Sequence, residues 1–160
     1  MRCKVHVIQL SSDRCDIEGS IEMNLGQTFN TKVDALVCFG FTGKMLQAGV
    51  WRIRTSATRS LWFPWLGEYK FGTNSLSVDE TELIDKRVSN FPPNGQYATM
   101  DEKLERVVFL GTRVERNQVL FTFKGVFKPD ILNSQRSIST WKRVSDHCRE
   151  PDGSWTAEEA

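Results

Sequence analysis

The alternation of apolar and polar residues along the chain predicts strands far more often than helices. Asp16 to Asn24 alternates cleanly, as a strand with one buried face does, and so does Val50 to Thr55. In the second segment the pattern places Trp51 on one face and both Arg52 and Arg54 on the other. We therefore expect a half-buried strand at each position.

The clearest prediction is a long β-hairpin from Arg106 to Phe127, with its turn at Glu115 to Gln118. Val107 begins one apolar face of the first strand and Val108 begins the other. On the return strand the phenylalanines between Phe121 and Phe127 are expected to share one face. Since both faces are apolar, the hairpin is expected in the centre of a sheet rather than at its edge.

Two shorter segments complete the expected fold. The apolar run from Asp34 to Phe41 is compatible with a strand or a short helix, and its glycines favour a strand. Asp79 to Lys86 has the acidic start of a short helix, and Pro64 argues against a central strand through Leu61 to Gly67. The predicted class is α+β, with a mostly antiparallel, strongly curved or barrel-like β-sheet and a few short helices.

Length and charge narrow the class of protein. The 160 residues are expected to form one globular domain over residues 1–149, followed by a polar, acidic tail over residues 150–160. The 21 Lys and Arg nearly balance the 20 Asp and Glu, so bulk charge argues against unspecific coating of nucleic acid or membrane. There is no long apolar run and no secretory signal, which predicts a cytoplasmic protein without a membrane partner.

The sequence offers little for metal or cofactor chemistry. The cysteines are isolated and lack the C-x-x-C spacing of zinc sites, and neither a P-loop nor a dinucleotide-binding glycine motif occurs. His147 adjoins Cys148, but adjacency in sequence does not make a catalytic pair. We therefore expect no metal, no cofactor and no catalytic residue.

Aromatic rings beside cations suggest a binding function. A protein that reads an extruded base sandwiches it between rings, contacts its edge with hydrogen bonds and holds the flanking phosphates with basic groups. A competing interpretation is that the rings are core and the arginines a solvated surface, except for Trp141, which lies in a polar stretch. The candidate rings are Trp51, Trp62, Trp65 and Trp141; the candidate phosphate contacts are Arg52, Arg54, Arg59, Lys142 and Arg143; the candidate edge contacts are Asp146 and Asn74.

A resemblance supports the binding interpretation. Trp62-Phe63-Pro64, Asn74 to Ser77, Phe123 to Phe127 and Trp141 to Asp146 occur in the order seen in poorly characterised bacterial modules of restriction-type and helicase-type defence proteins. The chain resembles such modules over Leu61 to Asp146. The resemblance invites a fold-level comparison with the SRA, EVE and PUA-like barrels that read modified bases.

Two alternatives remain open. Asp34 with Glu68 and Lys70 fits the minimal pattern of a Mg²⁺-dependent nuclease of the PD-(D/E)xK type. The exposed rings would also suit a protein-protein interaction module of a defence or phage system. The favoured prediction is a non-catalytic module whose partner is nucleic acid, with a protein partner as the alternative and the oligomeric state left open.

Overall fold

A computed structural model of the protein describes residues 21–41, 49–53, 56–70, 72–87, 101–115, 118–135, 137–150 and 157–159. No helix in these ranges is long and apolar enough to cross a membrane. The elements are β1 (Ile21–Asn24), β2 (Thr28–Phe29), α1 (Lys32–Val37), β3 (Val50–Ile53), β4 (Arg59–Trp62), β5 (Gly67–Tyr69), β6 (Gly72–Leu76), β7 (Glu82–Arg87), β8 (Glu105–Glu115), β9 (Gln118–Pro129), β10 (Ile138–Ser145), β11 (His147–Glu150) and β12 (Ala157–Glu159).

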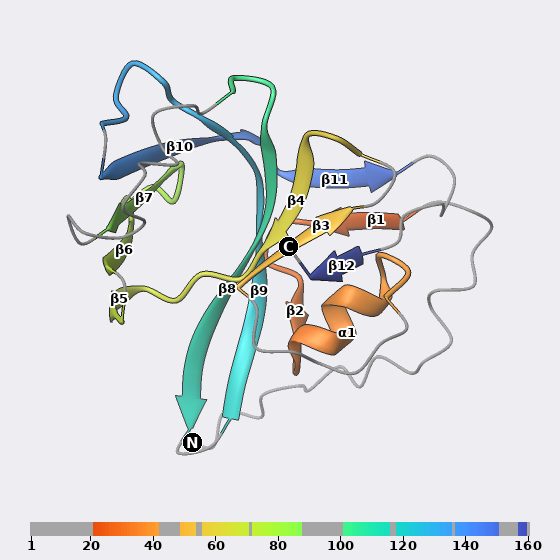
Figure 1. Ribbon diagram of the computed structural model, residues 1–160. Helices are drawn as coiled ribbons and strands as arrows, with labels where there is room; N and C mark the ends of the chain where they lie inside the picture. The colour runs from red at the N-terminus through yellow and green to blue at the C-terminus, as the bar shows by residue number, and fades with distance from the viewer. Residues whose placement is uncertain are drawn as a thin grey trace.

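A ten-stranded sheet dominates the structure (Figure 1). Its strand order is β12-β3-β4-β8-β9-β10-β7-β6-β5, β2 also pairs with β9, and β1 pairs with β11 in a separate two-stranded sheet. Among the described strands every ladder is antiparallel except that between β4 and β8. The expected mostly antiparallel class is confirmed, whereas a barrel-like sheet is not, because the outer strands β12 and β5 do not pair with each other in the described part.

The predicted hairpin is confirmed as β8 and β9, and it lies in the middle of the sheet. Its register shifts twice, first where Val108 pairs with Gly125 but Phe109 with Phe123, and again near the turn between Arg113 and Glu115. Gly125 adopts a φ of +108°, which a residue with a Cβ avoids. The bulge turns Phe127 away from the face that carries Phe123, so the expectation that the phenylalanines share one face is wrong.

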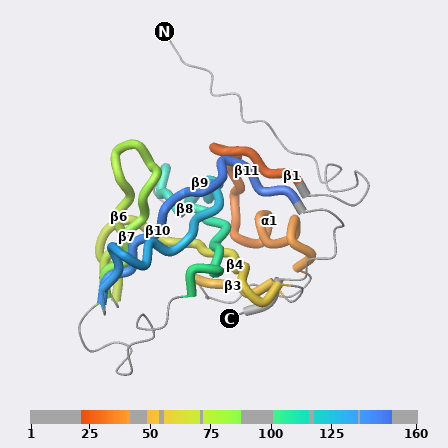
Figure 2. The backbone as a smooth tube through the Cα atoms, turned by 90° about the horizontal axis from the view of Figure 1, so that it is seen from above, coloured from red at the N-terminus to blue at the C-terminus, as the bar shows by residue number. Residues whose placement is uncertain are grey.

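Hydrophobic cores lie on both faces of the central strands. Val107 and Phe109 belong to a larger core together with α1, whereas Val108 packs into a smaller core. Figure 2 shows the two sides of the molecule, with α1, β1 and β11 on one side of β8 and β9 and with β6 and β7 on the other. The smaller core consists of Trp62, Leu83, Val108, Phe127 and Trp141.

The segment expected to be a strand at Asp34 is the helix α1. Thr31 and Asp34 form a capping box, in which Thr31 Oγ1 accepts from Asp34 N at 3.1 Å and Asp34 Oδ2 accepts from Thr31 N at 2.9 Å. Ala35 and Leu36 of this helix are buried in the larger core. A local cap thus decides between two structures that the apolar run alone did not distinguish.

The segment expected to be a helix from Asp79 is a tight turn followed by the strand β7. The carboxylate of Asp79 accepts hydrogen bonds from the hydroxyls of Ser77 and Thr81, and Glu80 has a φ of +59°. The acidic residues therefore close a turn instead of starting a helix. β7 then pairs with β6 on one edge and β10 on the other, which fixes it as a strand.

The alternation in the Val50 segment is confirmed, because Trp51 and Ile53 are buried while Arg52 is exposed. Residues 157–159, expected within a polar tail, form β12 and pair with β3. The strand predicted over Asp16 to Asn24 is found as β1 in its described part, whereas residues 16–20 and Arg54 lie outside the described residues.

Candidate functional site

The four candidate tryptophans do not line one pocket. Trp51 is fully buried in the larger core, and Trp62 and Trp141 are buried in the smaller core. Trp65 is 37% exposed and packs against Phe121 and Gly111. Trp65 is therefore the member of this set whose ring reaches solvent.

Trp62 and Trp141 pack at a tilt of 54° and share one cation. Their ring centroids lie 5.9 Å apart, and the guanidinium carbon of Arg106 lies 4.4 Å from the first centroid and 4.2 Å from the second. The indole Nε1 of Trp141 donates to Ser139 Oγ at 3.0 Å in the buried interior. These contacts are those of a supporting layer, since each ring has its partners inside the protein.

Two of the candidate phosphate contacts, Arg59 and Lys142, form ion pairs with carboxylates of the protein. Arg59 pairs through Nε with Glu105, and Lys142 Nζ lies 2.7 Å from Asp130 Oδ2. The hydrogen bond and charge of Asp130 raise the pKa of Lys142, and the hydrogen bond from Lys142 helps lower the pKa of Asp130 to about 2. Both Lys142 and Asp130 are therefore charged at neutral pH.

Arg143 and Asp146 are brought together by the fold. Arg143 Nε lies 3.0 Å from Asp146 Oδ1, and the Asp146 side chain is 66% exposed. Arg143 Nη1 is buried and has no hydrogen-bond partner among the described residues. Arg52 lies on the exposed face of β3, on a different part of the sheet, and Arg54 is outside the described residues.

A row of buried polar side chains crosses β6, β7 and β10. Asn74 pairs in register with Asp85, and Asp85 pairs with Ser139, so the three side chains lie on one face of three neighbouring strands. All three are at least nine-tenths buried, Asp85 to within 1% of full burial. The Oδ1 atom of Asn74 has no hydrogen-bond partner among the described residues. We call Asn74, Asp85 and Ser139 the polar row.

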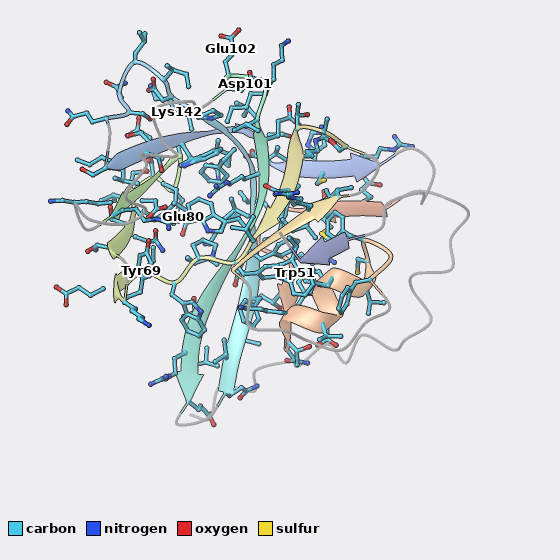
Figure 3. All side chains as sticks on the ribbon, in the orientation of Figure 1. Trp51, Tyr69, Glu80, Asp101, Glu102 and Lys142 are labelled. Carbon is cyan, nitrogen blue, oxygen red and sulfur yellow. The ribbon has the colours of Figure 1, made fainter. Side chains whose placement is uncertain are left out.

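Two half-exposed side chains hold the carboxylate of Asp85. The hydroxyl of Tyr69 donates to Asp85 Oδ1 at 2.8 Å, and Arg87 Nε lies 3.1 Å from Oδ2. Partial burial, together with the hydrogen bond to Asp85, raises the pKa of Tyr69 to about 12. Figure 3 shows Tyr69 on the side of the molecule formed by β5, β6 and β7, away from Trp51. Tyr69 and Arg87 are partly exposed, so they are the members of this cluster that reach solvent.

The polar row lies directly beside the smaller core. Leu83 lies two residues before Asp85 on the same face of β7, and its cross-strand partner Trp141 lies two residues after Ser139 on the same face of β10. A buried carboxylate next to an amide oxygen accepts hydrogen bonds from a planar ligand that carries an amino group. Sequence reasoning included Asn74 as an edge contact but missed Asp85, because that residue was assigned to a helix. No local signal marked Asp85, because it shares the buried face of β7 with Leu83 while the apolar Ile84 lies on the other face.

The residues of the nuclease alternative are not assembled into a metal site. Asp34 is used in the capping box of α1, whereas Glu68 and Lys70 lie on or next to β5, the outer strand beyond β6. Among the described residues no group of three His, Cys, Asp or Glu side chains is arranged to hold a metal ion.

Comparison with known proteins gives a consistent result. Residues 18–149 match the sequence profile of the SRA domain, described as "SET and RING associated". Among solved structures, the chain is similar to "The 5-Hydroxymethylcytosine-Specific Restriction Enzyme AbaSI", with a TM-score of 0.66 and 21% sequence identity. The match covers 82% of this chain but 43% of that chain, so this chain corresponds to less than half of the restriction enzyme's length. No curated protein matches the chain.

Proposed function

The chain belongs to the SRA (SET and RING associated) domain family, and from this premise we propose that it binds DNA and reads one extruded, modified cytosine at the polar row. The AbaSI enzyme, whose fold this chain resembles, is described as specific for 5-hydroxymethylcytosine. The proposal takes cytosine modified at C5 as the ligand class.

The observation that carries the proposal is the unpartnered Oδ1 of buried Asn74 beside the buried carboxylate of Asp85. An acceptor left unpaired in the interior destabilises a protein by about 1–3 kcal/mol, so a purely structural row would favour a different residue. A ligand that donates hydrogen bonds removes this penalty when it binds.

Cytosine has the hydrogen-bonding pattern that this row selects. Its exocyclic N4 amine donates, and a carboxylate such as that of Asp85 accepts from it. Thymine and uracil present a carbonyl oxygen at the same place, and an oxygen facing a carboxylate is repelled. The half-exposed ring of Tyr69 lies next to the carboxylate and provides an aromatic surface for the base.

The aromatic and basic residues predicted from the sequence take two roles in this proposal. Trp62 and Trp141 support the row from the smaller core, and Arg106 fixes them. Arg52 and Lys142, which are exposed, are proposed to contact backbone phosphates. Phosphate contacts predict that DNA affinity falls steeply as the salt concentration rises, which a hydrophobic protein interface would not show.

The test compares binding to duplexes that differ in one base: cytosine, 5-methylcytosine, 5-hydroxymethylcytosine or thymine. We expect Asn74→Ala to reduce the preference of the wild-type protein by about tenfold to a hundredfold, the range for loss of one base-edge contact. Asn24→Ala is the matched control, because Asn24 is exposed on β1 in the separate two-stranded sheet. Fluorescence anisotropy with labelled duplexes measures each affinity.

Stability separates a functional role of Asn74 from a structural one. Because its Oδ1 has no partner, Asn74→Ala removes a buried unpaired acceptor and is expected to leave the melting temperature unchanged or higher. Two results would refute the proposal. One is a wild-type protein that binds all four duplexes equally; the other is an Asn74→Ala variant that keeps the full preference of the wild type.

A further inference from the structure

A cavity of about 440 Å³ lies away from the polar row, at the end of the central strands where β8 begins. It is bounded by residues of β4, β8, β9, β10 and β11, and it shares no residue with the polar row. Val126 and Cys148, both buried members of the larger core, form its floor. The lining is mixed, with three apolar side chains and six polar or charged ones.

The rim of this cavity carries more positive than negative charge. Arg59, Lys128 and Arg149 face one carboxylate, that of Glu105. Burial alone would raise the pKa of Glu105, but the hydrogen bonds and charges of Arg59 and Lys128 outweigh it and hold that pKa below its usual range. Glu105 is therefore ionised, and the three cations exceed it by two charges.

The cations are placed by strands rather than by loops. Arg59 on β4 pairs in register with Glu105 on β8, and Lys128 Nζ lies 3.3 Å from Glu105 Oε1. One carboxylate thus orients two cations toward the same opening. Arg149 is exposed on β11 and forms no ion pair with any described carboxylate. Two of the three cations are thus held in place, which suits an oxyanion because these two lose little order when the anion binds.

We propose that this cavity is a second ligand site, which binds the phosphate of a nucleotide on the rim of Arg59, Lys128 and Arg149 and places the rest of the nucleotide over Val126 and Cys148. The phosphate neutralises the excess charge of the rim, and the apolar floor accommodates the base or sugar. The nucleotide is either a free monophosphate or part of a DNA strand. This inference does not depend on the function proposed for the polar row.

The test uses thymidine monophosphate, with thymidine as the probe without phosphate. Thymine is the base that the polar row is proposed to reject, so a signal from this nucleotide reports on the cavity. In ¹⁵N–¹H correlation spectra at low salt we expect thymidine monophosphate to shift the amides of Val126 and Cys148, and thymidine to leave them unchanged. Arg149→Gln should weaken the binding by about tenfold, as expected for loss of one charge-assisted contact.

Two control variants locate the effect. Arg113→Gln removes an exposed arginine at the far end of β8 and should leave the nucleotide affinity unchanged. Asn74→Ala should also leave it unchanged, so failure of this inference and failure of the proposed function can be told apart. If Arg149→Gln does not fold, Lys128→Gln tests the same rim of cations and should also weaken nucleotide binding.

The two sources of the phosphate are distinguished with an unmodified duplex. If Arg149→Gln and Lys128→Gln weaken duplex binding and reduce its salt dependence, the cavity holds a backbone phosphate. If they weaken nucleotide binding alone, it holds a free nucleotide. The inference is overturned if neither ligand responds to the variants, if thymidine binds as well as its monophosphate, or if Asn74→Ala abolishes the nucleotide shifts.

Discussion

Replacing Trp141 with alanine should unfold the smaller core rather than remove a ligand contact. The side chain is 1% exposed and packs with Trp62, Leu83 and Phe127. It also supplies one of the two rings that enclose Arg106 and donates its indole N–H to Ser139.

The expected loss follows from these contacts. Truncation of a buried Trp to Ala destabilises by about 3–5 kcal/mol, and the variant also leaves the hydroxyl of Ser139 without its donor, which adds about 1 kcal/mol. Trp141→Ala also removes one of the two rings that contact the Arg106 guanidinium. We therefore expect the total loss of unfolding free energy to be about 5 kcal/mol, at the upper end of the range for a buried Trp. Since domains are stable by about 5–15 kcal/mol, Trp141→Ala should lower the melting temperature by about 10–20 °C or prevent folding.

Urea unfolding at 25 °C measures the change, and Trp65→Ala is the matched control. The Trp65 ring is 37% exposed, so the same truncation there should destabilise by less than about 2 kcal/mol. The reasoning fails if Trp141→Ala keeps the wild-type m-value and loses less than about 2 kcal/mol, or if the Trp65→Ala variant is the less stable of the two. If Trp141→Ala does not fold, Trp141→Phe, which keeps an aromatic ring but removes the N–H, should still show a loss of about 1–3 kcal/mol.

Two further predictions concern the bulge and the buried carboxylate. Gly125→Ala should destabilise the protein by about 2–4 kcal/mol in the same unfolding assay, because the φ of Gly125 is +108° and an added Cβ would lie 2.5 Å from the carbonyl oxygen of Ser145. Gly49→Ala is the control: an added Cβ there would have no atom within 4 Å, so stability should change by less than about 0.5 kcal/mol. The phenol of Tyr69 should titrate near pH 12 when its Cζ resonance is followed by NMR, and Asp85→Asn should move this pKa toward 10. Because the folded state raises this pKa, its contribution to stability is present below about pH 10 and is lost as the pH rises through about 12. An unchanged Tyr69 titration in the Asp85→Asn variant would contradict the assigned hydrogen bond.

The parts of the fold that sequence predicts well are those decided by local alternation. In β3 the buried Trp51 and Ile53 flank the exposed Arg52, as a half-buried strand requires. The central hairpin is also predicted, because a strand pair that is apolar on both faces has no stable place at a sheet edge. In β3 burial follows a period of two without interruption, so the sequence alone determines which face each residue occupies.

The errors occur where a single backbone feature changes the pattern. Gly125 adds one residue to β9 and thereby reverses the faces of Val126 and Phe127, which no periodicity shows in advance. In α1 the capping box of Thr31 and Asp34 selects a helix for a run that suits either structure. In β7 pairing on both edges overrides the helix-like composition, because two ladders contribute more than intrinsic propensity.

The burial of Trp141 could have been predicted from the sequence, whereas the assembly of the polar row could not. Trp141 lies in a polar stretch, yet Lys142 and Val144 are exposed while Ser139 and Trp141 are buried, so strand alternation explains its burial. The polar row brings together Asn74, Asp85 and Ser139 from three strands. Their meeting depends on the register of β6, β7 and β10, which the sequence does not specify by itself.

The smaller core and the polar row lie on one face of the same strands. The smaller core stabilises the fold, whereas burial of the polar row does not. Leu76, Leu83 and Trp141 form an apolar row of the kind that stabilises a sheet. One step along the strands, Asn74 and Asp85 bury an amide and a carboxylate, and Asn74 Oδ1 has no partner among the described residues. Burying these groups opposes folding by a few kcal/mol, which an apolar pair of similar size would avoid. Buried atoms without a partner among the described residues also occur at Trp51 and Arg143, but the acceptor of Asn74 lies beside the carboxylate that is proposed to read a base, where binding of a hydrogen-bond donor would remove its cost.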